Sequence, residues 1–334
     1  MQDFKINVDG ASDRLWEPMW QIEIQLSSVE LELLRSHTMR RLHHIHHCGP
    51  IYYNSSLTYS RLQHTLGVFA TVAHLEPEHK ELRAAALLHD IGHVPFSHTL
   101  ERIDGIDHHQ HTIELIQSSE ITEILVRQGM EPGKILQFIT GEIRSVLRNK
   151  DHVLHLDHLD SWIRSAYHSG RLPISPREIL KEIKLGDGNI YTGLQTAQLF
   201  KQLIVEEAKM HCSPANITAN ALIKDLVETL IHHNELSLLE LPMMTDSMVE
   251  HRLLSSEFTK ERFSKFMNDS WSLSVTRDTD KLPQDYYEWM INKLYFSIPL
   301  TSDPDCDIYY NEVKSDFAQL EEQLKGLYFT YWDH

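Results

Sequence analysis

The residues best suited to chemistry are His89 and Asp90, an imidazole beside a carboxylate at the end of an apolar helical stretch. Burying such a pair is costly unless a further group compensates both side chains. A divalent cation can do so, because neutral imidazole and carboxylate are both good ligands for Zn, Mn and Fe. Two more ligands are available in His64, early in the preceding helical stretch, and Asp157, near the start of a later amphipathic one. The sequence therefore predicts a metal site formed by these four side chains.

The ligand set also indicates what the metal would do. Two histidines and two aspartates leave coordination positions for water and a phosphate oxygen, so the ion can lower the pKa of that water and polarise a phosphoryl group. A structural site is usually closed by four protein ligands, often thiolates, but Cys48, Cys212 and Cys306 are too few and too scattered for that role. We expect a catalytic divalent metal ion, and the ligand types leave Mn, Fe, Zn, Mg, Ni and Co open.

The motifs around these ligands resemble a known family. The similarity is carried by six segments, Arg40–Gly49, Arg61–Val68, Leu87–His98, Asp157–Asp160, Tyr167–Gly170 and Met244–Asp246. Together they look like the HD superfamily of metal-dependent phosphohydrolases, and more narrowly like its deoxynucleoside triphosphate triphosphohydrolases, the branch of the SAM- and HD-domain dNTPases. The resemblance covers roughly residues 15–255. It implies an all-helical fold in which the four side chains above hold the metal.

The resemblance also implies which histidines are catalytic. His93 and His98 match histidines that lie beside the substrate phosphates, and His108 best matches the proposed general acid. An imidazole with a pKa of about 6.5 can protonate a leaving oxygen at neutral pH. The neighbouring His109 is included in the expected catalytic set, and both it and His111 stay open as alternatives for the acid.

Three residues are expected to bind the substrate. Arg61 matches a phosphate-contacting arginine of the family. Arg40 stands where many dNTPases have a base-reading glutamine, and His158 stands where the family has a phosphate-contacting basic residue. Ser161 and Ser165 replace a tyrosine and an aspartate that contact the substrate there. We therefore expect the metal chemistry to be retained and the substrate pocket to be altered.

One departure concerns the general acid itself. The family usually has glutamate directly after this histidine, whereas His109 follows His108 here. The carboxylate that orients the imidazole must then come from Glu101 or Asp107. The nearby Asp160 is expected to stabilise its helix or to support a metal ligand, and not to be a ligand itself.

These observations predict hydrolysis of a nucleotide phosphoester, specifically a (deoxy)nucleoside triphosphate cleaved to nucleoside and tripolyphosphate. Three alternatives stay open. A phosphodiesterase or nucleotidase would act on another phosphoester. A di-iron oxygenase would need two further histidine ligands, for which His93, His98 and His108 are available. A non-catalytic nucleotide-binding protein would explain the missing glutamate after His108.

Helix signals dominate the chain and position these residues. Apolar side chains recur at helical period, and capping-box spacing begins at Ser27. The expected helices are 60–75, 80–90, 108–118, 120–129, 142–148, 153–168, one that starts at Ser175–Pro176, 194–210, 214–232 and 311–326. The clearest strand signal is a hairpin near 181–191, centred on Gly186–Gly188. The expected fold class is all-α, the HD-domain helical fold, with this minor β-hairpin.

The same signals divide the chain into two parts. We expect an HD domain over residues 1–255, with its metal core at about 38–170. A mostly helical extension is expected over 256–334. Within it, a polar linker at 270–284 would lead to a C-terminal segment that packs on the main body or on another subunit. Its Tyr and Trp residues are expected in the core or at a subunit contact. A homo-oligomer is expected by analogy with the family.

Composition limits the partners. The formal charge of −17 over 334 residues argues against nucleic acid, because such binding needs clustered Lys and Arg. It leaves room for a small nucleotide substrate at a locally positive metal site. The chain lacks an apolar run of bilayer length, and Met1–Gly10 has no secretory signal, so we expect a cytoplasmic protein without a membrane partner. Among 23 histidines, the cluster His43, His44, His46 and His47 is expected to form a solvated helix face.

Overall fold

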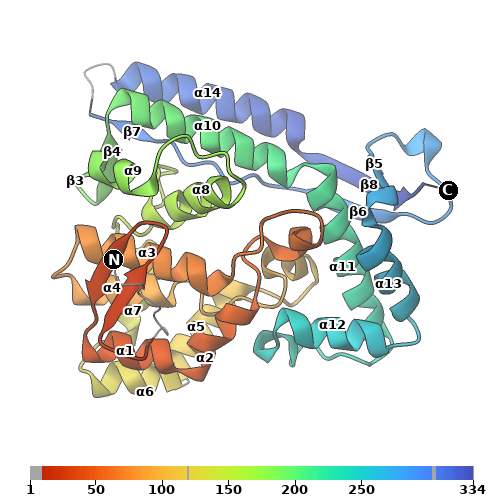
Figure 1. The fold of residues 1–334 in the computed structure, drawn as a ribbon, viewed down its shortest axis with the longest axis horizontal. Coiled ribbons are helices and arrows are strands. Elements are labelled where there is room, and N and C mark those ends of the chain that lie inside the picture. The colour runs from red at the N-terminus through yellow and green to blue at the C-terminus, as the bar shows by residue number, and fades with distance from the viewer. Residues whose placement is uncertain (1–9, 119, 303–305, 334) are drawn as a thin grey trace, which may run out of the picture.

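The computed structural model describes residues 10–118, 120–302 and 306–333 and confirms the expected mostly helical class with minor β-structure (Figure 1). The α-helices are α1 (Ser28–Arg35), α2 (His37–Arg41), α3 (Arg61–Leu75), α4 (Lys80–Leu88), α5 (His108–Ser118), α6 (Glu120–Arg127), α7 (Pro132–Ile139), α8 (Leu156–His168), α9 (Pro176–Glu182), α10 (Leu194–His211), α11 (Pro214–His232), α12 (Asp246–Ser255), α13 (Lys260–Asp269) and α14 (Cys306–Leu324). Short 3₁₀ helices span Leu42–His44, Gly49–Tyr53, Ser97–Arg102, Leu241–Met243, Ser270–Ser272 and Thr279–Lys281. Along the described residues no helix is both long and apolar enough to cross a membrane.

The strands form three small sheets. They are β1 (Arg14–Glu17), β2 (Ile22–Gln25), β3 (Lys184–Gly186), β4 (Asn189–Thr192), β5 (Leu273–Thr276), β6 (Tyr287–Ile291), β7 (Leu300–Thr301) and β8 (Gly326–Trp332). β1 pairs with β2, and β4 lies between β3 and the parallel β7. The antiparallel β3–β4 pair confirms the predicted hairpin, whose turn places Asp187 and Gly188 at positive φ.

The C-terminal segment contains the helix expected at 311–326, as α14, but the segment 270–284 is not the expected linker. Part of the 270–284 segment is strand β5, which pairs in register with β8, and β8 pairs in turn with β6. This sheet packs against α11 through β5, β6 and β8, so the end of the chain returns to the main body. α14 lies beside α10 (Figure 1). The proposed domain division at residue 255 stays a prediction, although one apolar cluster joins Leu222 and Phe263 from either side of it.

Helix α3 carries His64, and its capping residues and apolar side chains hold it firmly in the core. The Ser60 side chain accepts a hydrogen bond from the backbone N–H of Gln63, and the Gln63 side chain accepts one from the Ser60 backbone. This capping box satisfies two of the free amides at the helix start. Nearly all of the α3 side chains are buried, and the helix contacts both α4 and α8. The helix that carries His64 is therefore held on several sides.

The helix predicted at 142–148 is wrong, and the prediction missed α7 just before it, as it also missed α2, α12 and α13. Gly141 takes a positive φ of 71°, which ends helical geometry after α7. The backbone beyond it makes loop hydrogen bonds, including one from the Leu156 amide to the Val146 carbonyl. Val146 and Leu147 are buried, so their apolar spacing reflects a loop packed into the core. The loop matters because it carries Arg148.

A buried charge network fixes α8 against the N-terminal hairpin. The Arg164 guanidinium donates hydrogen bonds to Asp160 and Glu17 at 2.9 Å each, and the Trp20 indole N–H donates to Asp160 at 2.6 Å. Arg164 is only 2% exposed. Its positive charge compensates the charges of two buried carboxyl groups.

We expect Arg164→Met to lower the free energy of unfolding by about 3–5 kcal/mol, because it leaves Asp160 and Glu17 buried without their cation. Chemical denaturation followed by circular dichroism measures this difference. Arg171→Met is the matched control, since Arg171 pairs with Glu206 near the surface and such pairs contribute about 0–1 kcal/mol. Equal stability losses in the two variants would contradict the assignment of a buried network.

Candidate metal centre and active site

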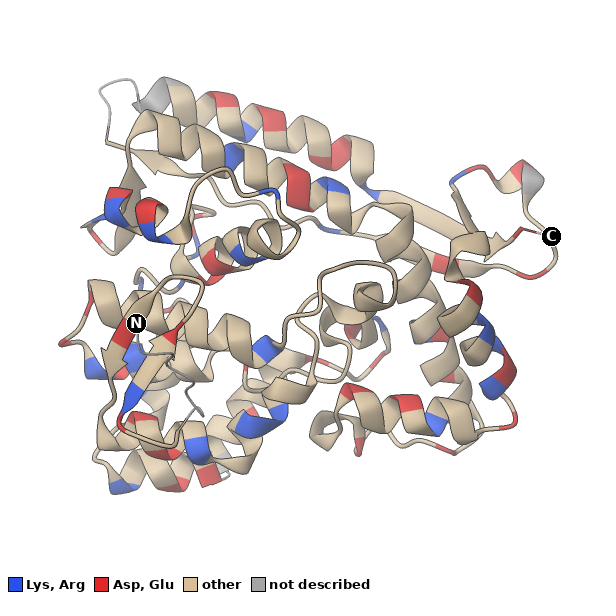
Figure 2. Ribbon diagram, in the orientation of Figure 1, with Lys and Arg blue, Asp and Glu red and all other residues tan. Residues whose placement is uncertain are grey.

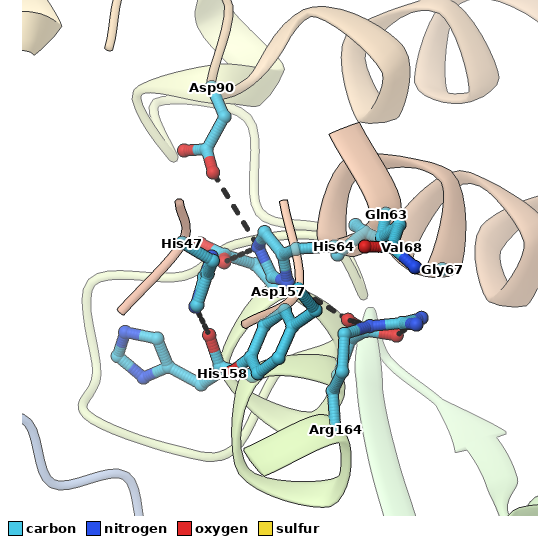
Figure 3. A network of polar contacts seen from close by, with 12 residues as sticks. His47, Gln63, His64, Gly67, Val68, Asp90, Asp157, His158 and Arg164 are labelled. Atoms are coloured by element: carbon cyan, nitrogen blue, oxygen red, sulfur yellow. Dashed lines mark hydrogen bonds and ion pairs between the residues drawn. The ribbon is translucent and has the colours of Figure 1, made fainter. Parts of the chain in front are cut away.

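Three helices bring the predicted metal ligands together. His64 lies in the first turn of α3, His89 directly follows α4 with Asp90 next to it, and Asp157 lies in the first turn of α8. Figure 3 shows His64 between Asp90 and Asp157, with Arg164 farther away. All four side chains are at least mostly buried. His64 and Asp157 are about ninety residues apart in the sequence, and the packing of α3 against α8 brings them together.

The two imidazole Nε2 atoms lie next to each other and close to both carboxylates. The Nε2 atom of His64 lies 3.3 Å from Nε2 of His89, 3.3 Å from Oδ1 of Asp157 and 3.6 Å from Oδ2 of Asp90. The Nε2 atom of His89 lies 3.5 Å from the same Asp90 oxygen and 3.7 Å from the same Asp157 oxygen. Ligands bound to one ion at about 2.0–2.2 Å are separated from their neighbours by about 3.0–3.6 Å. The donor set and its spacing therefore fit a single divalent cation.

The Nδ1 atoms of both histidines, which point away from the ligand cluster, already make hydrogen bonds. Nδ1–H of His64 donates to Oδ2 of Asp160 at 2.9 Å, and Nδ1–H of His89 donates to the Ala86 carbonyl at 2.8 Å. Such contacts select the tautomer and leave Nε2 free for a metal. Asp160 supports His64 in this way and is not one of the four converging groups.

The electrostatics of the site keep its carboxylates ionised. Burial alone raises the pKa of Asp90, but the nearby His89 and Arg61 outweigh it and hold that pKa well below its usual range. Burial is likewise outweighed at Asp157, chiefly by the hydrogen bond from His64. Burial lowers the pKa of His64, while Asp157 and Asp160 raise it to about 9. The carboxylates are thus in the ionised form that binds metals, and their negative charges favour the binding of a cation.

A second polar group lies on the Asp90 side of this centre. Nε2 of His93 is 3.4 Å from Oδ1 of Asp90, and the His93 ring stacks on the His108 ring with centroids 4.1 Å apart. Glu101 joins them: its carboxylate contacts Nδ1 of His108 at 2.5 Å and Nδ1 of His98 at 3.0 Å. Burial raises the pKa of Glu101, but His98 and His108 outweigh it and lower the pKa. The fold thus places three histidines, His93, His98 and His108, around the ionised carboxylate of Glu101.

Glu101, and not Asp107, supplies a carboxylate to His108 in place of the glutamate that the resemblance led us to expect directly after it. Asp107 instead accepts hydrogen bonds from the backbone amides of His109 and Gln110 and caps α5. His109 lines the cavity beside His108, and burial lowers its pKa to about 4. His111 is absent from the cavity lining and contacts Glu114. Of the three adjacent histidines, His108 is the one that both lines the cavity and contacts Glu101.

A cavity of about 130 Å³ opens over these groups. Of the three expected substrate-binding residues, Arg61 and His158 line it, whereas Arg40 on α2 does not. Arg61 donates to Asp90 at 2.9 Å and to the His47 carbonyl at 2.8 Å. The lining also includes residues that we did not predict, namely His47, Cys48, Arg148, Trp162, Glu207, His211 and Tyr295.

The expectation for the histidine cluster at 43–47 is right in part. His43 and His44 are exposed, as a solvated face requires. His47 instead lines the cavity and contacts the Ser161 hydroxyl at 2.9 Å, and His46 contacts Asp246 at 2.8 Å. A 3₁₀ turn at 42–44 ends the helix before these two residues, so helical periodicity could not show where they point.

Glu207 is an unpredicted carboxyl group on the cavity wall. It comes from α10, is 7% exposed and accepts a hydrogen bond from the Ser165 hydroxyl at 2.7 Å. Burial raises its pKa to about 7. Ser165 stands where the resemblance implied a substrate-contacting aspartate. Glu207 of α10 contacts Ser165 and so places a carboxyl group near that position. No local signal in the sequence could have shown this contact between residues 42 positions apart.

Comparison with known proteins agrees with this geometry. Residues 61–180, which include all four predicted metal ligands, match the HD domain family. The protein MJ1154 of Methanocaldococcus jannaschii is 30% identical over 267 residues, which are 73% of this chain and 56% of that protein. The metal-dependent phosphohydrolase cns2 of Cordyceps militaris is 27% identical over 156 residues, 45% of this chain and 44% of its own length. The chain thus spans about half of the length of these relatives.

Solved structures show the same fold over nearly the whole chain. A phosphohydrolase from Bacteroides thetaiotaomicron superposes with a TM-score of 0.68 and 15% identity, covering 96% of this chain and all of that one. A protein from Aquifex aeolicus superposes with a TM-score of 0.67 and 18% identity, covering 96% of both chains. At these identities the likeness concerns the fold alone, including the C-terminal segment.

Proposed function

Residues 61–180 form a domain of the HD family, and from this premise we propose that the protein is a metal-dependent hydrolase of nucleotide phosphoesters. Its specific reaction, in this proposal, is cleavage of a (deoxy)nucleoside triphosphate to nucleoside and tripolyphosphate. The observation that carries the proposal is that His64 and His89 lie 3.3–3.7 Å from each other and from the carboxylates of Asp90 and Asp157, beside a histidine paired with a carboxylate. The names of cns2 and of the Bacteroides structure support the same class of reaction.

The four converging side chains would hold the cation, which when bound polarises a phosphoryl oxygen and activates water. Arg61 then offers its guanidinium to the phosphate from the wall of the cavity, because only part of its hydrogen-bonding capacity is used by Asp90 and the His47 carbonyl. Burial, followed by the charge of Arg61, lowers the pKa of His93. A neutral His93 can donate a hydrogen bond to a phosphate oxygen without adding a proton to it.

His108 acts as the general acid in this proposal. Glu101 accepts the Nδ1–H of His108, which directs Nε2 toward the cavity and stabilises the protonated imidazole. The Nε2 proton passes to the oxygen of the leaving nucleoside as the bond from that oxygen to phosphorus breaks. Glu101 keeps its charge throughout, because its role is to orient the ring and not to take a proton.

The test is the product pattern. Metal-loaded protein is incubated with a panel of ribo- and deoxyribonucleoside triphosphates, monophosphates and a phosphodiester, and the products are resolved by ion-exchange chromatography. The proposal requires free nucleoside and tripolyphosphate in equal amounts. Release of orthophosphate or pyrophosphate from the same substrates would instead establish a nucleotidase or phosphodiesterase.

One observation keeps a di-iron oxygenase as a second candidate. His93, His98, Glu101 and His108 offer ligand atoms within 4.8 Å of one another, next to Asp90. Metal analysis separates the two functions, since the oxygenase needs two irons per chain and consumes oxygen. The non-catalytic alternative is less well supported by the structure than by the sequence, because Glu101 lies where it can fill the role of the missing glutamate.

A further inference from the structure

We propose that a cation-lined cleft beside the metal centre binds the phosphate chain of the substrate. This inference rests on the proposed function and assigns the side chains that hold the phosphates beyond the one at the metal centre. The cleft has a volume of about 470 Å³ and lies between the 148–158 loop, the 293–298 segment and α14. None of its cations belongs to the motifs by which the sequence resembles the HD superfamily.

The cleft is continuous with the cavity over the metal ligands. Arg148, His158 and Tyr295 line both spaces. His158 directly follows the ligand Asp157, and its Nδ1 contacts the Ser297 hydroxyl at 2.7 Å. A phosphate held at the metal centre therefore has a direct path for its chain past His158 into the cleft.

The charges of the cleft favour an anion. Arg148, Lys150, Lys293 and Lys314 line it and form no ion pair with any residue that the structure describes. Its two acidic lining residues are both neutralised from outside: Asp151 by Arg144 at 2.8 Å and Glu321 by Lys325 at 2.9 Å.

This excess of positive charge is unusual in the molecule as a whole. The chain carries a formal charge of −17, and acidic side chains are spread over its helices, including α14 (Figure 2). Four unpaired cations in one recess are costly at close range unless a bound anion offsets their repulsion. A phosphate chain supplies several negative oxygens along one line, and Arg and Lys are the side chains that bind them best.

Arg148 and Lys293 are the cations nearest to the path into the cleft. Arg148 lines both spaces together with His158, and Lys293 lines the cleft together with His158. The Lys293 ammonium group also lies 5.2 Å from the centre of the Tyr295 ring. Both cations therefore stand within electrostatic reach of the residue that joins the two spaces.

The binding test uses inorganic tripolyphosphate as the probe. Full-length metal-loaded protein is titrated by calorimetry in buffer with the same free metal throughout, and orthophosphate is titrated in parallel. Charge-assisted hydrogen bonds contribute about 1.5–3 kcal/mol, so Arg148→Gln should weaken tripolyphosphate binding by about 10- to 100-fold. Lys293→Gln should weaken it in the same direction, and orthophosphate, which fits at the metal centre alone, should bind to all variants alike.

Matched controls come from α9, whose Arg177 and Lys181 are exposed and absent from both cavities. Arg177→Gln and Lys181→Gln remove the same charges and should leave both affinities unchanged. Equal tripolyphosphate affinity in Arg148→Gln and the unchanged protein would overturn the inference. So would equal losses in the control variants, which would mean a general charge effect.

The outcome is separable from that of the proposed function. Tripolyphosphate binding that depends on Arg148 and Lys293, without hydrolysis of any nucleotide in the panel, would refute the proposed function and support the cleft. Nucleotide hydrolysis with the same KM in Arg148→Gln as in the unchanged protein would support the proposed function and refute the cleft.

Discussion

Asp90→Ala is expected to abolish both bound metal and turnover. One Asp90 oxygen lies 3.6 Å from Nε2 of His64 and 3.5 Å from Nε2 of His89, so its removal deletes one of four converging ligands. The same change removes the carboxylate that receives the hydrogen bond from Arg61. Loss of a group that merely supports a ligand costs about 10- to 100-fold in metal affinity, and loss of the ligand itself should cost more. Elemental analysis after gel filtration and the nucleotide assay measure the two effects.

The design includes a change that keeps the shape of the side chain. Asp90→Asn preserves the volume and should still lower metal content strongly, because a neutral amide is a poorer ligand for these ions than a carboxylate. Asp107→Ala is the control: its carboxylate caps α5, so it should cost about 1 kcal/mol of stability and retain metal. A fully metal-loaded and active Asp90→Ala protein would refute the metal-site assignment.

The second large effect is expected from His108→Gln. The variant should keep its metal, because no converging ligand is changed, and should lose about 10²- to 10⁴-fold in kcat, the range that general acid catalysis contributes. KM should change little, since the acid acts on the leaving oxygen and not on the bound phosphate. A substrate with a 4-nitrophenyl leaving group needs no protonation, so its hydrolysis should fall far less than that of a nucleotide.

The leaving-group comparison separates an acid from a structural residue. Misfolding or a displaced metal would slow both substrates equally, and that result would overturn the role of His108. Glu101→Gln should reproduce the pattern more weakly, because it removes the charge that orients the imidazole and keeps the imidazole itself. His111→Gln is the matched control, since His111 lies outside the cavity lining, and it should retain full activity.

Local patterns in the sequence were sufficient to predict most of the helices, and the motifs selected four side chains that the structure brings close together. The capping box at Ser27, the helix expected at 60–75 and the hairpin turn around Gly186–Gly188 were predicted at the positions where the structure has them. These features depend on residues three or four apart, which interact whatever the rest of the chain does. The prediction failed at 142–148 because a buried loop and an amphipathic helix can show the same apolar spacing.

Only the tertiary structure decided which side chains accompany the predicted ligands. Glu101 was one of two carboxylates that the sequence allowed for His108, and the path of the chain after Phe96, at a positive φ of 55°, brings it there. Glu207, Arg148 and Lys293 come from a helix, a loop and the C-terminal segment that carry no motif. Their position depends on how distant elements pack, and packing is set by the fit of buried surfaces across the whole core. The sequence therefore determined which side chains are available as metal ligands, while the fold decided the shape and charge of the space around them.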